Sequence, residues 1–251
     1  MAERGCFALF CGGAEGPSGD VEHKRPAKKA VDSCKTSEST IKDGLGGKDP
    51  QRDAKVQKLE RKFNKYFNAH NGTNLQTGDE DLFREHQSQS TYGYLTFKGM
   101  EDMFRDMDTE GKIFYDLGSG VGKPPVAAAM LFPNLKKCIG IELSKGRHLQ
   151  GAAVLKELKD REIRDKVELR HGSMLEEQLK DADIVYISSL CFSNNFLTRL
   201  GRHLDSVLTL GTVVLTSKAV SMTRAEYLGR KTVAMSWNST HQLYHYKIIK
   251  Q

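Results

Sequence analysis

The sequence predicts an α/β fold built on a mostly parallel, doubly wound sheet. The first observation is that short apolar runs alternate with helical patterns from about residue 112 to residue 217, as in repeated strand–helix units. The second is that the run Ile113-Phe114-Tyr115 leads directly into a glycine-rich loop, while the next run ends in Glu142. Ligands bind at the carboxyl ends of parallel strands, so we expect the loop and this acid to share one edge of the sheet.

The expected elements follow in chain order. Strands are expected at residues 112–116, 137–142, 166–171, 183–188 and 212–217, and helices at residues 123–131, 144–160, about 175–180 and about 194–208. Two further strands, near residues 232–237 and 242–249, are close enough to form an antiparallel hairpin that completes seven strands. Ahead of the sheet, we expect helices at about residues 52–68 and 96–107 and, between them, an ordered loop at residues 73–91.

Composition divides the chain into three parts. Only 38% of its 251 residues are hydrophobic, and the deficit is concentrated in residues 1–50, which are rich in Gly, Ser, Lys and Asp and show no periodicity. Such a segment cannot bury enough apolar surface to order itself, so we expect a disordered arm. Residues 51–110 are expected to form a helical N-terminal part, and residues 111–251 to form the α/β domain.

The chain is basic, with a formal net charge of +6 and a sequence pI near 9.0. This balance fits an acidic partner such as nucleic acid, chromatin or an anionic surface, although it fits a merely soluble basic protein as well. Within the arm, His23–Lys29 is a basic cluster of the kind used for nuclear import or phosphate contact. The helix expected at residues 52–68 is apolar on one face and basic on the other. It is either a solvated helix packed on the domain or a basic helix that faces DNA phosphates.

Other classes of function have little support in the sequence. The five cysteines have no paired metal-ligand spacing and the eight histidines are scattered, so no metal centre is expected. The same cysteine usage fits a reduced intracellular compartment. No apolar run of about 18 residues or more is present that could span a membrane. The apolar stretch Cys6–Cys11 is too short for a signal peptide, and its role is open.

The glycine-rich loop carries the most specific chemical signal. Asp116, Gly118, Gly120 and Gly122 form an Asp-x-Gly-x-Gly-x-Gly pattern, whereas a dinucleotide fingerprint requires G-x-G-x-x-G. An acid in the loop disfavours a phosphate and suits a cationic sulfonium cofactor that also carries an amino group. Glu142 suits hydrogen bonding to the two ribose hydroxyls of an adenosine-containing cofactor. The pattern resembles the first motif of class I S-adenosylmethionine-dependent methyltransferases.

Two further stretches are similar to one family within that superfamily. Ser90–Thr96 contains a Tyr-Gly pair about 20 residues before the loop, and Asp183–Phe192 ends in Cys-Phe just after the fourth strand. With the glycine loop, they resemble the disruptor-of-telomeric-silencing (Dot1-like) family of histone H3 lysine methyltransferases over roughly residues 90–220. The resemblance implies the class I methyltransferase fold, with a seven-stranded, mostly parallel, doubly wound sheet. The small helical N-terminal part and the disordered N-terminal arm expected above would precede it.

The resemblance also implies an activity. The protein would be a nuclear histone-lysine N-methyltransferase that transfers methyl groups from S-adenosylmethionine to a lysine in the globular core of histone H3 in nucleosomes. Because such lysines lie beside DNA, basic N-terminal segments would hold DNA phosphates without reading the sequence. Two alternatives stay open. One is a methyltransferase for a non-histone protein or RNA, and the other is a catalytically silent chromatin-binding module.

The resemblance assigns cofactor-binding residues in four segments. Tyr92, Gly93, Tyr94 and Leu95 would form a lid over the cofactor, although Tyr94 stands where the family usually has Glu. The glycine loop would bracket the methionine part of the cofactor, and Glu142 would hold the ribose. After the third strand, Ser173 and Met174 occupy the place of the family's Asp-Phe beside the adenine. The loop residues so assigned are Phe114, Tyr115, Asp116, Leu117, Gly118, Ser119, Gly120, Val121, Gly122 and Lys123.

The acceptor side departs furthest from the family. The family has Asn-Asn-Phe-x-Phe after the fourth strand, whereas this chain has Ser188-Ser189-Leu190-Cys191-Phe192. The pair Asn194-Asn195 follows, either as a helix cap or as amides that reach the methyl group. The attacking lysine must be neutral, and an apolar channel beside a sulfonium lowers its pKa. We expect Ser188 to orient the amine and the aromatic residues Tyr94, Phe192 and Trp237 to line the channel, although each aromatic residue fits a core position as well.

Overall fold

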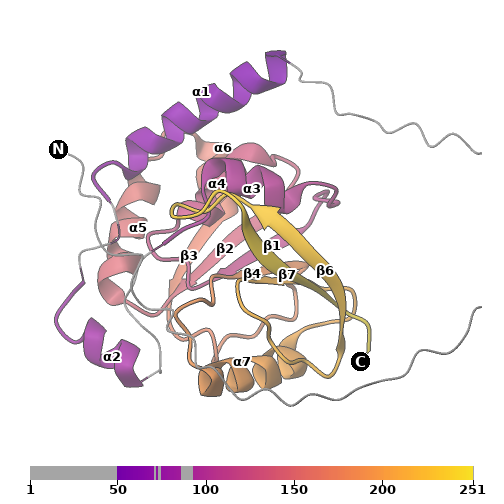
Figure 1. Ribbon diagram of the computed structural model, residues 1–251. Coiled ribbons are helices and arrows are strands. Elements are labelled where there is room, and N and C mark those ends of the chain that lie inside the picture. Colours follow the sequence, from indigo (N-terminus) through magenta and orange to yellow (C-terminus); the bar gives the residue numbers. More distant parts are fainter. Residues whose placement is uncertain (1–49, 71, 73–74, 86–92, 251) are drawn as a thin grey trace, which may run out of the picture. The chain divides into compact units, whose positions relative to one another are not determined.

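Seven strands form one mixed sheet, as expected (Figure 1). They are β1 (Ile113–Leu117), β2 (Lys137–Glu142), β3 (Val167–His171), β4 (Ile184–Ile187), β5 (Val213–Thr216), β6 (Ala225–Val233) and β7 (His241–Ile248). Their order is β3-β2-β1-β4-β5-β7-β6. Strands β1 to β5 are parallel, and β7 pairs antiparallel with both β5 and β6. The winding reverses between β1 and β4, which is where such sheets bind ligands.

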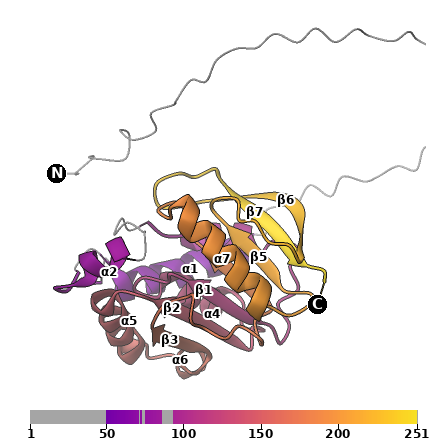
Figure 2. The same cartoon turned by 90° about the horizontal axis from the view of Figure 1, so that it is seen from below.

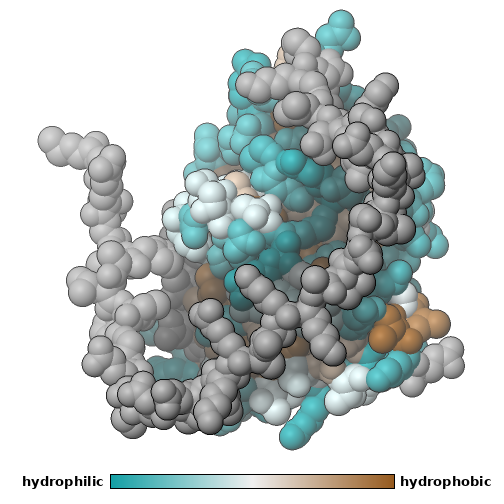
Figure 3. Space-filling view, turned by 45° about the vertical axis from the view of Figure 1, so that its right-hand side comes forward, coloured by the Kyte–Doolittle hydropathy of each residue, from teal (hydrophilic) through white to brown (hydrophobic). Residues whose placement is uncertain are grey.

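The computed structural model describes residues 50–70, 72, 75–85 and 93–250. The expected disordered arm, its basic cluster His23–Lys29 and the lid residue Tyr92 lie outside the described residues. Residues 50–251 belong to one structural unit. The separate boundary expected near residue 110 stays a prediction. Within the described part, the helices are too short or too polar to cross a membrane, and the described surface seen in Figure 3 is mostly hydrophilic.

Helices cover both faces of the sheet (Figures 1 and 2). One face carries α1 (Pro50–Phe67), α3 (Phe97–Phe104), α4 (Lys123–Leu131), α5 (Lys145–Glu157) and α6 (Arg161–Lys166), and the other carries α7 (Asn194–Val207). Phe114 and Tyr186 belong to the first core, and Tyr115 and Val185 to the second, because successive strand residues point to opposite faces. The short helix α2 (Asp79–Glu85) lies with α5 at the β3 end of the sheet, away from β6 and β7.

Helix α1 is amphipathic, as its sequence pattern predicts. Phe63 and Phe67 are buried, and the Phe63 ring lies 5.3 Å from that of Phe97, centroid to centroid. Lys58 and Lys65 are exposed on the outer face. The apolar face therefore packs on the domain, while the outer face presents positive charge to solvent.

Two expectations about helices were wrong, and one short helix, α6, was not expected. Residues 175–180 form turns and irregular chain, because so short a stretch gains few hydrogen bonds of its own as a helix. The helix expected at residues 144–160 is confirmed as α5, and α6 is a further helix that was not expected, capped by the Asp160 side chain, which accepts the Ile163 N–H at 3.5 Å. Helix α2 lies inside the loop expected at residues 73–91.

Two expected boundaries also need correction. Strand β6 occupies residues 225–233 instead of 232–237, and Met235 forms an isolated bridge with Leu95 beyond its end. The cap of α7 is Ser193, whose Oγ accepts the Phe196 N–H at 3.1 Å, and the asparagine pair forms the exposed first two residues of that helix. The other described elements begin and end within a few residues of their expected positions.

Candidate functional site

The glycine-rich loop is fixed to the carboxyl end of β2. The Gly118 N–H donates to the Ile141 carbonyl at 2.8 Å. Gly118, Gly120 and Gly122 have φ values of +95°, +58° and +81°, a region that glycine alone enters readily. A Cβ on Gly118 would meet only the Cε of Met174, at 3.5 Å. The loop backbone at Gly118 is therefore open to a ligand, with Met174 beside it.

A buried carboxyl group without a donor lies at the end of β1. Asp116 is 1% exposed, and its Oδ2 has no hydrogen-bond partner among the residues that the structure describes. Burial, together with the charge of Glu142, raises the pKa of Asp116 well above its ordinary value. An unsatisfied buried carboxyl is costly. Asp116 is therefore suited to a ligand that brings a positive charge and N–H donors, such as an amino group.

Glu142 is held in place by backbone donors. Its Oε2 accepts the Gly120 N–H at 2.7 Å, and its Oε1 accepts the Ser144 N–H at 2.9 Å. Burial raises the pKa of Glu142, and these two N–H groups oppose the rise. A carboxylate has about four acceptor positions, so each oxygen keeps capacity for one more donor. This arrangement suits the two neighbouring hydroxyls of a ribose.

Asp79, which falls in the loop expected from the sequence, joins α2 to this edge of the sheet. Its Oδ2 accepts the Ser144 Oγ–H at 2.7 Å, and its oxygens also accept the N–H groups of Lys145 and Gly146 at 3.2 and 3.3 Å. Burial alone would raise the pKa of Asp79, but these hydrogen bonds outweigh burial and lower it. The only sequence signal is an acidic first helical turn, which many exposed helices share.

The lid segment that begins at Gly93 is bonded to the loop between β6 and β7. The Tyr94 N–H donates to the Ser236 Oγ at 3.2 Å, and the Ser236 N–H donates to the Tyr94 carbonyl at 2.9 Å. Gly93 lies against the Trp237 ring, because a Cβ there would be 2.1 Å from Cζ3 of the indole. Trp237 and Tyr94, two of the expected channel residues, therefore lie in two segments that are held together by hydrogen bonds.

Lys123 supplies a buried cation on the other side of the glycine loop. It begins α4 and is 7% exposed, and its Nζ lies 3.6 Å from the centroid of the Tyr94 ring. Burial lowers the pKa of Lys123 to about 8. The N–H groups at the start of a helix favour negative charge as well. With Asp116, the site therefore presents one acid and one cation, which match the amino and carboxylate groups of an amino acid.

The other expected loop residues differ in what they can offer. Four of their side chains fill the two cores, so that only their backbone can meet a ligand: Phe114, Val121, Tyr115 and Leu117. Ser119 is buried, and within the described ranges no hydrogen bond engages its Oγ. Ser173 is also buried, and its Oγ accepts the Leu175 N–H at 3.3 Å.

The expected acceptor residues are only partly brought together. Ser188 follows β4 and is half-buried, level with Ser217, which follows β5. Both continue the strand face on which Tyr186 lies, in the core that also contains residues of the lid. Phe192 instead packs on Phe196, with ring centroids 4.6 Å apart, against the core on the α7 side. The structure therefore places Phe192 as a core contact on the α7 side and Ser188 on the opposite face of the sheet.

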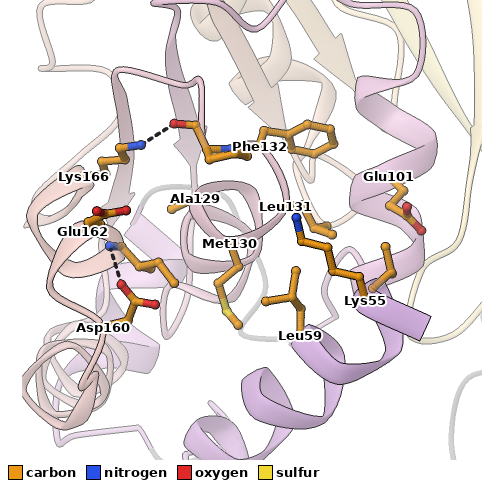
Figure 4. Close-up of a pocket in the computed structure, with 13 residues that line it drawn as sticks. Lys55, Leu59, Glu101, Ala129, Met130, Leu131, Phe132, Asp160, Glu162 and Lys166 are labelled. Atoms are coloured by element: carbon orange, nitrogen blue, oxygen red, sulfur yellow. Dashed lines mark hydrogen bonds between the residues drawn. The ribbon is translucent and has the colours of Figure 1, made fainter. Parts of the chain in front are cut away.

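A separate cavity of about 310 Å³ lies near the last turn of α4 (Figure 4). Residues from α1, α4 and α6 line it, among them Leu59, Met130 and Ile163. Because α4 begins at the glycine loop and this cavity adjoins its other end, the cavity is not part of the site around Asp116. In the described part of the chain, no cluster of three or more His, Cys, Asp or Glu side chains could hold a metal ion.

A family model described as "Histone methylation protein DOT1" matches residues 81–247. Curated protein sequences give no significant match. An RNA methyltransferase from Salinibacter ruber, solved with S-adenosyl-L-homocysteine, is 22% identical over 61% of this chain and 91% of its own, with a TM-score of 0.48. The putative methyltransferase yhhF from Escherichia coli is 13% identical over 61% and 87%, with a TM-score of 0.49.

Proposed function

The chain belongs to the DOT1 histone methylation family, and from this premise we propose that it methylates a lysine in the globular core of histone H3 within nucleosomes. The methyl donor is S-adenosylmethionine. One feature of the site gives the main support for cofactor binding. Asp116, a buried acid whose Oδ2 has no hydrogen-bond donor among the described residues, precedes a glycine loop whose backbone is open at Gly118, and the buried cation Lys123 follows that loop.

Each part of the cofactor has a chemically matched group at this edge of the sheet. Asp116 would take the amino group, and Lys123 the carboxylate, of the methionine part. The carboxylate oxygens of Glu142, already oriented by two backbone N–H groups, would accept from the ribose hydroxyls. Met174, next to Gly118, and the buried Ser173 would lie beside the adenine.

When bound, S-adenosylmethionine would supply a methyl group on a positively charged sulfur, and the lysine nitrogen would take this methyl group as the C–S bond breaks and its electron pair stays on sulfur. The protein's own task is alignment and exclusion of water. Trp237 and Tyr94 would form an apolar wall at which a charged amine loses hydration, which would lower the pKa of the substrate lysine and favour its neutral form. The proton passes to water before attack. Ser188 would then orient the neutral amine.

A nucleosomal substrate is supported by the position of α1. Its exposed basic side chains, such as Lys58 and Lys65, face solvent, while its buried Phe67 ring lies 5.9 Å from the Lys123 Nζ. The end of a basic helix thus adjoins the cofactor edge. Lysines and arginines on such a face bind DNA phosphates without reading sequence. We infer nuclear action from the histone substrate, and the cluster His23–Lys29 is a suitable import signal.

The test is transfer of labelled methyl from S-adenosylmethionine to reconstituted nucleosomes, free histones and RNA. Two variants are compared, Gly118→Arg and Gly111→Arg. Both glycines have positive φ and both are exposed, but Gly111 precedes β1 at the opposite edge of the sheet. We expect label on nucleosomal H3 for the natural chain and for Gly111→Arg, and none for Gly118→Arg. Label on RNA or on free protein alone would reject the nucleosomal substrate.

A further inference from the structure

Three hydroxyl groups gather on one face of the sheet where β4 and β5 end. Tyr186 of β4 pairs with Asp116 of β1 on one side and with Leu215 of β5 on the other. Residues two positions further along a strand return to the same face. Ser188 and Ser217 therefore lie level with each other, directly beyond Tyr186, which pairs with the acid that is assigned to the cofactor.

The Tyr186 phenol is the centre of this group. It is 1% exposed, and it donates its proton to the Sδ of Met235 at 3.8 Å. Because that proton is engaged, the phenol oxygen is left as an acceptor. The strand register brings Ser188 and Ser217 to the same face just beyond the phenol, and their hydroxyls oppose the rise in the pKa of Tyr186. Burial and the Asp116 carboxyl raise the pKa of Tyr186, so the phenol stays protonated at neutral pH and does not act as a base.

A buried phenol at this place requires an explanation. A phenylalanine would fill the same volume without the cost of burying a hydroxyl. Ser217 is 5% exposed, and its Oγ has no hydrogen bond of ordinary geometry within the described residues. Met235, on the lid side, is a weak acceptor. The polar atoms of this group therefore satisfy one another only in part, as expected of groups arranged for an incoming ligand.

The direction of the serine hydroxyl decides whether it helps or hinders attack. A neutral amine has two N–H donors and one lone pair, and the lone pair must face the methyl carbon. A serine that donated its proton to that lone pair would compete with the reaction. A serine whose proton is already given to a phenol can only accept an N–H, which leaves the lone pair free.

We propose that Tyr186 is a positioning residue that binds the hydroxyl proton of Ser188 and so makes Ser188 an acceptor for the N–H of the substrate amine. Ser217, which follows β5, contributes the third hydroxyl of this cluster. This inference rests on the proposed function, since it requires an amine as the methyl acceptor. It adds that a phenol and a serine together orient the amine in this chain, where the sequence has no amide directly after β4.

The test is a double-mutant cycle on Tyr186→Phe and Ser188→Ala, with kcat and KM measured on nucleosomes. Tyr246→Phe is the matched control, because it removes a buried phenol that binds the Val220 N–H at 3.2 Å on the other face of the sheet. We expect Tyr186→Phe to lower kcat about three- to tenfold, the effect of one hydrogen bond. KM for nucleosomes and for the cofactor should stay within about twofold.

The decisive measurement is kcat of the double variant, Tyr186→Phe with Ser188→Ala. If Tyr186 acts through Ser188, adding Tyr186→Phe to Ser188→Ala lowers kcat no further. The inference is overturned if Tyr186→Phe lowers kcat by the same factor in the Ser188→Ala background as in the natural chain. It is also overturned if Tyr186→Phe lowers kcat no more than Tyr246→Phe does. In both cases the proposed function stands, provided that the natural chain labels nucleosomes. If the natural chain labels only RNA or free protein, the histone proposal fails, and the same cycle on that acceptor decides the role of Tyr186. If it labels nothing, both fail.

Discussion

Replacing the buried lysine at the glycine loop should stabilise the empty protein and weaken its cofactor binding. The pKa of Lys123 is lowered from 10.5 to about 8. At about 1.36 kcal/mol for each pH unit, the charged amine opposes folding by about 3 kcal/mol at pH 7. The interaction between the Lys123 Nζ and the Tyr94 ring, at 3.6 Å, returns about 0.5–2 kcal/mol. Lys123→Met keeps the apolar length of the side chain and removes the charge, so we expect a net gain of about 1–2 kcal/mol.

The gain should depend on pH in a defined direction. The pKa of Lys123 is lower in the folded state than in the unfolded state. The charged amine therefore destabilises the fold fully below pH 8, and this destabilisation disappears as the pH rises toward 10.5. For a unit of this size, about 1–2 kcal/mol raises Tm by about 2–8 °C. Thermal unfolding is therefore measured at pH 7 and pH 10, with Lys136→Met, at an exposed lysine, as the matched control.

Cofactor binding gives the second half of this prediction. If Lys123 pairs with the cofactor carboxylate, Lys123→Met should raise the Kd of S-adenosylhomocysteine by about ten- to hundredfold, the effect of removing one charged hydrogen bond from a buried site. Isothermal calorimetry measures this directly. A variant that is more stable but binds as tightly as the natural chain would show that Lys123 is not a ligand. A less stable variant, or a gain that persists at pH 10, would refute the electrostatic reasoning itself.

Three further outcomes are expected. Gly93→Ala should displace the Trp237 ring, since the new Cβ would lie 2.1 Å from it, and this should cost about 1–3 kcal/mol in unfolding and raise the cofactor Kd. Asp79→Asn should lower stability by about 1–3 kcal/mol at pH 7. Because the pKa of Asp79 is lowered in the folded state, this deficit should shrink as the pH falls below about 4 in an acid-unfolding series. Lys58→Glu combined with Lys65→Glu should weaken nucleosome binding and reduce its salt dependence, by about 0.9 in the logarithmic slope for each DNA phosphate that these lysines neutralise, without changing calorimetric cofactor affinity.

The centre of the fold was predictable because its signals are local. Strand β1 is buried along its whole length, and its apolar run ends at glycines whose positive φ values the turn requires. The sequence pattern therefore located Ile113–Gly122 and the acid Glu142 correctly. The lid assignment at Tyr92–Leu95 stays a prediction from the resemblance, and the packing of Gly93 on Trp237 gives a physical reason for a glycine at residue 93.

The remaining features depend on contacts between distant segments. Strand β6 is mostly exposed, so its residues carry no apolar alternation, while the alternation at Val233 and Met235 belongs to a strand end and a bridge to Leu95. Asp79 looks like an ordinary loop acid until the N–H groups of α5 are brought to it. The sequence pattern predicts only that Tyr186 is a buried strand residue. Its role depends on the registers that place it between Asp116 and β5.

The most direct measurement is the position of the methyl group on the product. Reconstituted nucleosomes are treated with the natural chain and S-adenosylmethionine, and the histones are mapped by tandem mass spectrometry, with Gly118→Arg and Gly111→Arg as paired controls. The account predicts methylation of a lysine in the globular core of H3, retained with Gly111→Arg and abolished with Gly118→Arg. Methylation confined to a histone tail, to another histone or to an arginine would contradict it.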